Sequence, residues 1–228
     1  MSEFRLALLT SQALFGELPA ALQDPFAKIA QSFEVEANLH PGEMMAGWGL
    51  KEERVVIQLT TTRAVVRVEN PADDEEAIAK SLSAWEKLQE RLQLGALAAF
   101  SIRVLLIADR SDRQLKDLVD KWRSTQPRSR AADEAINWAN VIVLPHAAGR
   151  RRLFFGPALA SHTKQSFQLD VEEQVFYQAD IDHVVGTNVQ FVGTVKRHEF
   201  SASIRESRDY AAGVLQTIEP EPAEGATE

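Results

Sequence analysis

The segment between residues 73 and 94 limits the architectures open to this chain, because it has the pattern of a long amphipathic helix. Acidic residues fill its first turn, where negative charge suits the helix dipole, and Gly95 follows as a natural stop. A stripe of this kind must be buried against another element, and strand-like segments flank it on both sides. The apolar stripe recurs at steps of three and four residues: Ile78, Leu82, Trp85, Leu88 and Leu92.

The flanking segments have the composition and alternation of strands. Residues 33–39 alternate apolar and polar side chains, which is the period of a half-buried strand. Segments 54–59 and 64–68 are rich in valine and isoleucine and predict a β-hairpin, which Asn70-Pro71 closes. Segment 100–108 is apolar on both faces, as a central covered strand requires.

The second half of the chain predicts two more helices and a run of strands. Residues 112–124 carry one apolar helical face, and residues 131–140 form a third, short helix that leads into a buried strand at 141–144. Alternation then predicts a four-stranded antiparallel meander. Its strands are expected at 167–171, 175–181, 189–195 and 200–204.

The sequence therefore predicts an α+β fold, with an antiparallel sheet or sheets packed by two or three helices and a C-terminal meander. The expected parts are an N-terminal α+β part (1–109), a helical basic connecting segment (110–164), the meander (165–210) and an acidic disordered tail (211–228). A single domain overall is the alternative. A looser hypothesis is an internal duplication that relates 33–109 to 141–205.

Composition narrows the chemistry. The chain has 228 residues, 45% of them hydrophobic, and no cysteine, which excludes disulfides, thiolate metal sites and cysteine nucleophiles. The N-terminus does not have the pattern of a secretory signal, and no apolar run approaches the roughly 18 residues of a spanning helix. We therefore expect a soluble cytoplasmic protein without a membrane partner.

Charge is unevenly distributed along the chain. Between Arg110 and Lys164 there are 11 Lys/Arg and 5 Asp/Glu, a balance of 11 − 5 = +6, so the remainder carries −8 − 6 = −14. Such a split favours an anionic partner or acidic surface of the same or a neighbouring chain. Its unbalanced part is a set of arginines on two predicted loops, suited by their planar donors to bind carboxylate or phosphate: Arg128, Arg130, Arg150, Arg151 and Arg152. The alternative is a solvated loop, or a set of arginines that pairs with acidic surface elsewhere in the assembly.

A second candidate contact lies in the glycine-rich segment 41–49. Met44, Met45 and Trp48 stand among its glycines, as in an apolar loop that contacts another protein. The alternative is that these side chains cover the core.

Support for catalysis is weak. Asp180 and Asp182 share one face of a predicted strand while His183 points to the other, so we predict no metal site there. No Gly-rich phosphate loop, zinc-binding helix or nucleophile elbow occurs, and no cofactor is predicted. His146 and His183 are the acid–base candidates if the protein is an enzyme, a question that the sequence leaves open.

The leading hypothesis is a non-enzymatic protein-interaction or assembly protein. Its basic loops would bind acidic protein surface, and its partner would be itself, as an oligomer, or another protein. The alternatives are an RNA- or DNA-binding module that uses the same arginines, and an enzyme that clamps an anionic substrate with them.

Overall fold

The computed structural model describes eleven segments of the chain. These are residues 4–14, 38–40, 45–50, 54–60, 62–92, 96–109, 114–124, 140–146, 149–159, 175–190 and 197–218.

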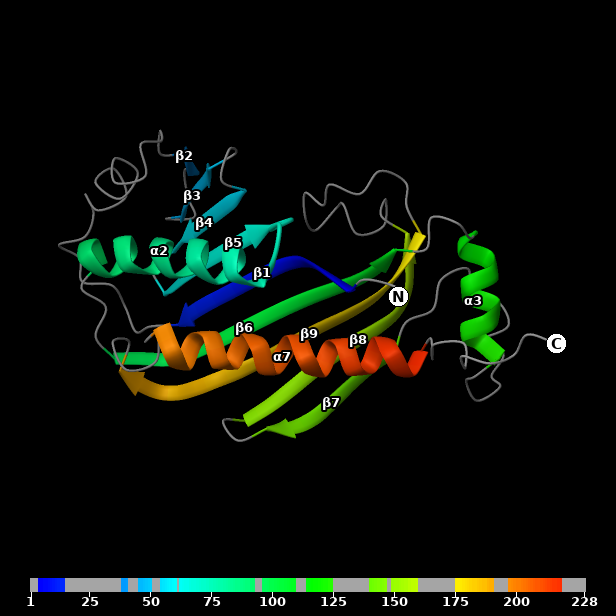
Figure 1. The fold of residues 1–228 in the computed structure, drawn as a ribbon. Helices are drawn as coiled ribbons and strands as arrows, with labels where there is room; N and C mark the ends of the chain where they lie inside the picture. Colours follow the sequence, from blue (N-terminus) through cyan, green and yellow to red (C-terminus); the bar gives the residue numbers. More distant parts are fainter. Residues whose placement is uncertain are drawn as a thin grey trace.

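One antiparallel sheet of nine strands organises the molecule (Figure 1). The strand order is β2-β3-β4-β5-β1-β6-β9-β8-β7, and every neighbouring pair is antiparallel. The strands are β1 (Phe4–Leu14), β2 (Asn38–His40), β3 (Met45–Leu50), β4 (Val55–Leu59), β5 (Arg63–Glu69), β6 (Ala96–Asp109), β7 (Asn140–His146), β8 (Gly149–Leu159) and β9 (Val175–Gln190).

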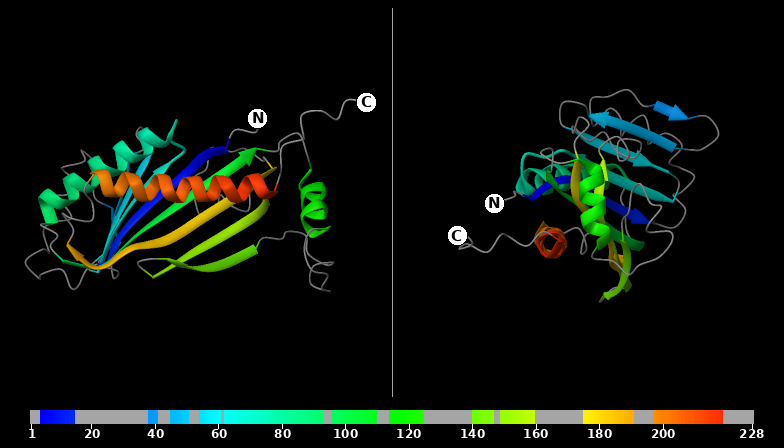
Figure 2. Two further views of the ribbon diagram at one scale, coloured as in Figure 1. Left: turned by 60° about the horizontal axis from the view of Figure 1, so that its bottom comes forward. Right: turned by 90° about the vertical axis from the view of Figure 1, so that its right-hand side faces the viewer.

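Two long helices, α2 (Asp74–Leu92) and α7 (Arg197–Ile218), lie on the same face of this sheet (Figure 2). Helix α2 packs on β5, β1 and β4, whereas α7 packs on β6 and β9. The shorter α3 (Leu115–Ser124) contacts β8 at one end of the sheet. We call the side that carries α2 and α7 the helix face. The opposite side, which carries neither of these helices, we call the open face, although Leu8, Leu105 and Ile107 form a second buried cluster there.

The described elements fall into two similar halves. In each half a long strand is followed by a meander whose last strand returns to pair with the first, and a long helix then crosses the helix face. The first half runs from β1 through β5 to α2, and the second runs from β6 through β9 to α7. This arrangement agrees with a duplication, but its halves begin near residues 4 and 96, not at the predicted residues 33 and 141.

Aromatic side chains on the helix face join both helices to the middle of the sheet. Trp85 of α2 meets Phe100 of β6 edge to face, with ring centroids 5.7 Å apart, and Phe100 lies 6.0 Å from Phe200 of α7. All three side chains are almost fully buried. The Trp85 indole N–H donates to Ser11 Oγ at 2.7 Å, and Ser11 also meets Ser81 of α2, so the polar atoms beneath α2 bond to one another.

The predicted α+β class is confirmed, as are the helix at 73–94, the hairpin that became β4 and β5, and the central strand within β6. Asn70, expected to close the hairpin, has a φ of 44° and donates its backbone N–H to Ala7 of β1 at 2.9 Å. Helix α3 confirms the helix predicted at 112–124.

Two predictions in the C-terminal half were wrong. Residues 200–204 are helical, because Phe200 and Ile204 continue as a buried stripe through Ala211 and Leu215 that a window of five residues does not show. Residues 182–188, expected to connect two strands, belong to the single long strand β9. Of the predicted meander, only the strand at 175–181 is confirmed, within β9. The meander that the structure has runs over β7, β8 and β9, and β8 includes arginines that were expected on a loop.

Several predicted elements lie outside the described residues. These are most of the strand at 33–39, the helix at 131–140 except Asn140, the strand at 167–171, residues 191–195 of the strand at 189–195, and residues 219–228 of the tail. The tail predicted to be disordered from 211 was wrong for 211–218, which belong to α7. The division of the chain into parts remains a prediction.

Changing Ser11 to alanine tests the buried polar contact beneath α2. Ser11→Ala removes the acceptor of the Trp85 indole and the partner of Ser81, so we expect a loss of about 1–3 kcal/mol in unfolding free energy. Ser101→Ala is the matched control, because Ser101 lies half-buried on β6, on the open face. It should change stability by less than about 0.5 kcal/mol in urea titrations. Equal effects of the two substitutions would contradict this assignment.

Candidate functional site

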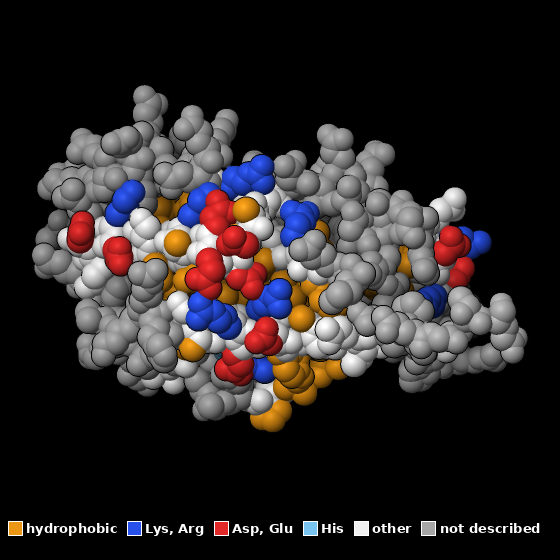
Figure 3. All heavy atoms as spheres, viewed as in Figure 1, with side chains coloured by type: hydrophobic (Ala, Val, Ile, Leu, Met, Phe, Trp, Pro, Cys, Tyr) orange, Lys and Arg blue, Asp and Glu red, His pale blue; other side chains and the backbone are white. Residues whose placement is uncertain are grey.

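The strand at one edge of the sheet, β7, presents apolar side chains to solvent. Val141, Ile142 and Val143 are 51%, 40% and 58% exposed, although all three lie inside the strand and not at its ends. Figure 3 shows hydrophobic side chains reaching the surface along the lower edge of the molecule, in the region of β7 and β8. An apolar edge strand with unsatisfied backbone groups is a template for pairing with another chain.

The prediction that 141–144 is a buried strand was therefore wrong. Apolar composition marks a covered strand only when helices or a second sheet lie over it. Helix α2 packs on β5, β1 and β4, α7 on β6 and β9, and α3 on β8, and among the described strands β7 pairs with β8 alone. Pro145 was the signal in the sequence that could have corrected the prediction, because proline within a strand is confined largely to sheet edges.

The predicted arginine loop is also wrong in its local structure. Arg150, Arg151 and Arg152 lie within β8, where successive side chains point to opposite faces. Arg150 and Arg152 are exposed, on the open face, whereas Arg151 is buried on the helix face. The three arginines therefore do not converge on one ligand. Arg128 and Arg130 lie outside the described residues.

Arg151 contacts α7 and helps to bind this helix to the sheet. Its guanidinium donates to Glu206 and stacks over the Tyr210 ring, 4.8 Å from the ring centroid. The Arg151 side chain is 9% exposed, but that of Glu206 is 58% exposed, so the pair lies at the margin of the interface. The partner of Arg151 is therefore a carboxylate of the same chain, a contact that the sequence analysis did not predict.

His183 is likewise part of the α7 interface. It is opposite Arg151 in the β8–β9 ladder, is 2% exposed, and its Nδ1 lies 3.0 Å from the hydroxyl of buried Ser207. The predicted orientation of His183, opposite to Asp180 and Asp182, is confirmed, and its side of the strand is the covered helix face. A histidine buried this deeply cannot meet a substrate at the surface.

On the open face, β6 and β9 carry a charge cluster next to the two exposed arginines. Arg103 forms a forked pair with Asp180, with Nε 2.8 Å from Oδ1, and this hydrogen bonding raises the pKa of Arg103. Asp182 lies opposite both Arg103 and Arg152 in its strand ladders. Sequence reasoning missed Arg103, although it is the one charged residue within an otherwise apolar run.

Asp182 balances part of the arginine charge. Partial desolvation by the neighbouring strands raises the pKa of its carboxyl group, although Asp182 is an exposed residue; Arg103 opposes that shift, and the like charge of Asp180 reinforces it. Arg152 and Arg150 also lower the Asp182 pKa, but less strongly. The open face therefore offers Arg150 and Arg152 with a carboxylate already beside them, which makes it a weaker anion clamp than three converging arginines.

The predicted contact loop at 41–49 is in part a strand. Met45 and Trp48 belong to β3, which pairs with both β2 and β4, and Met44 lies outside the described residues. Pairing with β4 supplies the backbone hydrogen bonds that overcome the low strand preference of Gly47 and Gly49.

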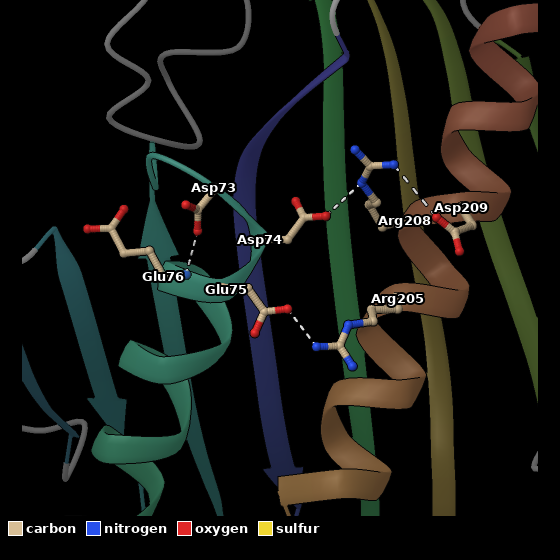
Figure 4. Close-up of polar contacts among 7 residues, drawn as sticks. All are labelled: Asp73, Asp74, Glu75, Glu76, Arg205, Arg208 and Asp209. Carbon is tan, nitrogen blue, oxygen red and sulfur yellow. Dashed lines mark hydrogen bonds and ion pairs between the residues drawn. The ribbon is translucent and has the colours of Figure 1, made fainter.

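A third charged cluster joins the two long helices (Figure 4). Arg208 Nε lies 2.7 Å from an Asp74 oxygen, and Arg205 donates to Glu75. Asp73 caps α2 by accepting the Glu76 N–H at 2.7 Å. The side chains of this cluster thus bond to one another and position α2 against α7.

Within the eleven described segments, no group of three or more metal-ligating side chains could hold a metal ion. The helices in those segments are also too short or too polar to cross a membrane.

Comparison with known proteins yields little beyond the geometry. No protein-family model matches the chain, and no curated protein matches it. Among solved structures, it is similar to Methanococcus jannaschii TBP, with 12% identity over 90% of this chain and 99% of that chain, and a TM-score of 0.33. A TM-score this low supports no conclusion on function.

Two adjacent arginines of β8, one on each face of the sheet, test whether only the one on the helix face stabilises the fold. Arg151→Met removes the contacts to Glu206 and Tyr210 and should lower the unfolding free energy by about 1–2 kcal/mol. Arg152→Met, one residue along on the open face, should change it by less than about 0.5 kcal/mol. Urea titrations in which both variants lose the same stability would contradict the division between faces.

The raised pKa of Asp182 predicts how the stability of the protein depends on pH. The pKa of Asp182 is raised in the folded protein, so folding disfavours its charged form at neutral pH. As the pH falls through the folded pKa, the carboxyl group takes up a proton and the wild-type protein loses this destabilisation. Asp182→Asn should therefore be more stable than wild type at neutral pH, with the difference shrinking toward the ordinary aspartate pKa of 3.8. Urea midpoints across this range measure it, and a variant that is less stable than wild type at neutral pH would refute it.

Proposed function

We propose that this protein is a non-enzymatic interaction module that binds another polypeptide by strand addition at the β7 edge. The observation that carries the proposal is the run Val141–Ile142–Val143, exposed on a strand that has a neighbour on one side only among the described strands. Strand addition supplies main-chain hydrogen bonds, and alternate side chains then add specificity.

Arg150 and Arg152 give the proposed edge a preference in charge. They lie on β8, next to β7, and Arg152 is directly opposite Val143. A strand added beyond β7 would place alternate side chains on the open face, about 10 Å from the β8 backbone and within reach of a long arginine. Acidic residues at those positions would complement Arg150 and Arg152, in part against competition from Asp182.

Enzymatic and nucleic-acid roles have less support. His183, one of two acid–base candidates, is buried beneath α7, and Arg103 is already paired with Asp180. Nucleic-acid binding by Arg150 and Arg152 is therefore an alternative that the experiment below also tests.

Two labelled peptides of about eight residues, a usual strand length, test the proposal. One alternates valine and glutamate, and the other alternates valine and lysine. Fluorescence anisotropy should show tighter binding of the glutamate peptide, by about two- to thirty-fold for two exposed ion pairs at low salt. The preference should shrink as salt is added.

A double variant, Arg150→Ser with Arg152→Ser, should remove the preference. Arg63→Ser is the matched control, because Arg63 is exposed on β5 on the opposite side of the sheet centre, and it should leave the preference intact. If neither peptide binds, strand addition is wrong. Salt-sensitive binding of a labelled oligonucleotide, with neither peptide bound, would favour the nucleic-acid alternative.

A further inference from the structure

The β7 edge also indicates what pairs with it. We propose that its occupant is a second copy of this chain, paired antiparallel through β7 about a two-fold axis at Ile142. This inference rests on the proposed function, since it names the partner of the same edge.

The first observation is that the exposed run is symmetric in sequence. Val141–Ile142–Val143 reads the same in both directions, so antiparallel pairing about Ile142 sets valine opposite valine and isoleucine opposite isoleucine. Cross-strand pairs of β-branched side chains stabilise a sheet. A two-fold interface requires a surface that is complementary to itself, and this run meets that requirement.

The second observation is the hydrogen-bond alternation of the β7–β8 ladder. His146 is opposite Gly149 at the end of the hairpin, where a two-residue connection has a hydrogen-bonded closing pair. Counting back from that pair along the register, the alternation rule predicts that Leu144 and Ile142 bond to β8, and that the backbone groups of Val141, Val143 and Pro145 point away from it. Proline fits this alternation, because at an outward position its missing N–H costs no bond to β8.

These two observations agree with each other. In the symmetric register, Val141 is opposite Val143 of the second copy, and both are outward-pointing residues that can form a hydrogen-bonded pair. The same pair recurs on the other side of the axis, and Ile142 meets its own copy at a non-hydrogen-bonded position between them. A register shifted by one residue would set outward groups against inward ones and lose these bonds.

Charge does not oppose this arrangement. Arg152 is opposite Val143 on β8, so the two copies of Arg152 would be separated by three strand spacings, about 14 Å. That distance exceeds the Debye length of about 8 Å at physiological ionic strength. A contact carried by one short strand is small, and we expect a weak or transient dimer, typical of interfaces under about 1,200 Å².

A single introduced cysteine tests the register, because the native chain has none. Ile142→Cys would place two sulfur-bearing residues at a non-hydrogen-bonded pair, with Cα atoms about 4.5 Å apart, within the range that a disulfide requires. Under mild oxidation at about 100 µM protein, suited to a weak dimer, most of the chain should become covalent dimer on non-reducing gels.

Leu144→Cys is the matched control on the same strand. In the proposed register its Cα lies about 14 Å from its own copy, too far for a disulfide. Equal crosslinking of the two variants, or none of Ile142→Cys, would overturn the inference.

A second variant keeps the test independent of cysteine chemistry. Val143→Pro removes an outward N–H while leaving the β7–β8 bonds in place, so sedimentation equilibrium should show at least a tenfold weaker dimer than wild type. Self-pairing is contradicted if Val143→Pro dimerises as strongly as wild type, or if wild type is wholly monomeric. If wild type is monomeric but binds the valine–glutamate peptide, the proposed function stands and only the self-pairing is wrong. If the dimer forms, that peptide should dissociate it.

Discussion

The structure depends on the antiparallel pairing of β1 with β6, which joins the two halves into one sheet. This ladder runs from Phe4 opposite Ala108 to Leu14 opposite Ala99. Each strand of the pair also receives the last strand of its own half, β5 on β1 and β9 on β6. Because both long helices cross the same face, their side chains meet at Phe100, and the core is continuous across the joint.

In this arrangement, charged and polar side chains on each of the two faces contact one another. The helix face uses its polar groups internally, as in the contacts of Arg151 with Glu206 and of His183 with Ser207. On the open face, Arg103 and Asp180 neutralise each other. Exposed apolar side chains gather on β7, which is an edge strand of the described sheet. The function that we propose uses this edge for binding and the neighbouring arginines for selectivity.

Local pattern predicted those elements whose environment follows from their own residues. The stripe of α2 and the valine-rich hairpin could be recognised because burial on one face imposes a fixed period. Strand β1 was missed, since Thr10, Ser11 and Gln12 interrupt its apolar run, and Ser11 is buried only because Trp85 and Ser81 bond to it. The start of α7 was mistaken for a strand, because three alternating residues fit both periods.

The sequence by itself determined the α+β class, the long helix, several strands and the absence of cysteine chemistry. Tertiary structure alone decided which side of each strand is covered, and that choice governs the candidate site. The arginines of β8 were visible as a charged run, but the pleat of a strand divides them between two faces. Likewise, an apolar segment is buried or exposed according to its neighbours, so Val141–Val143 became an edge only when the strand order placed β7 last.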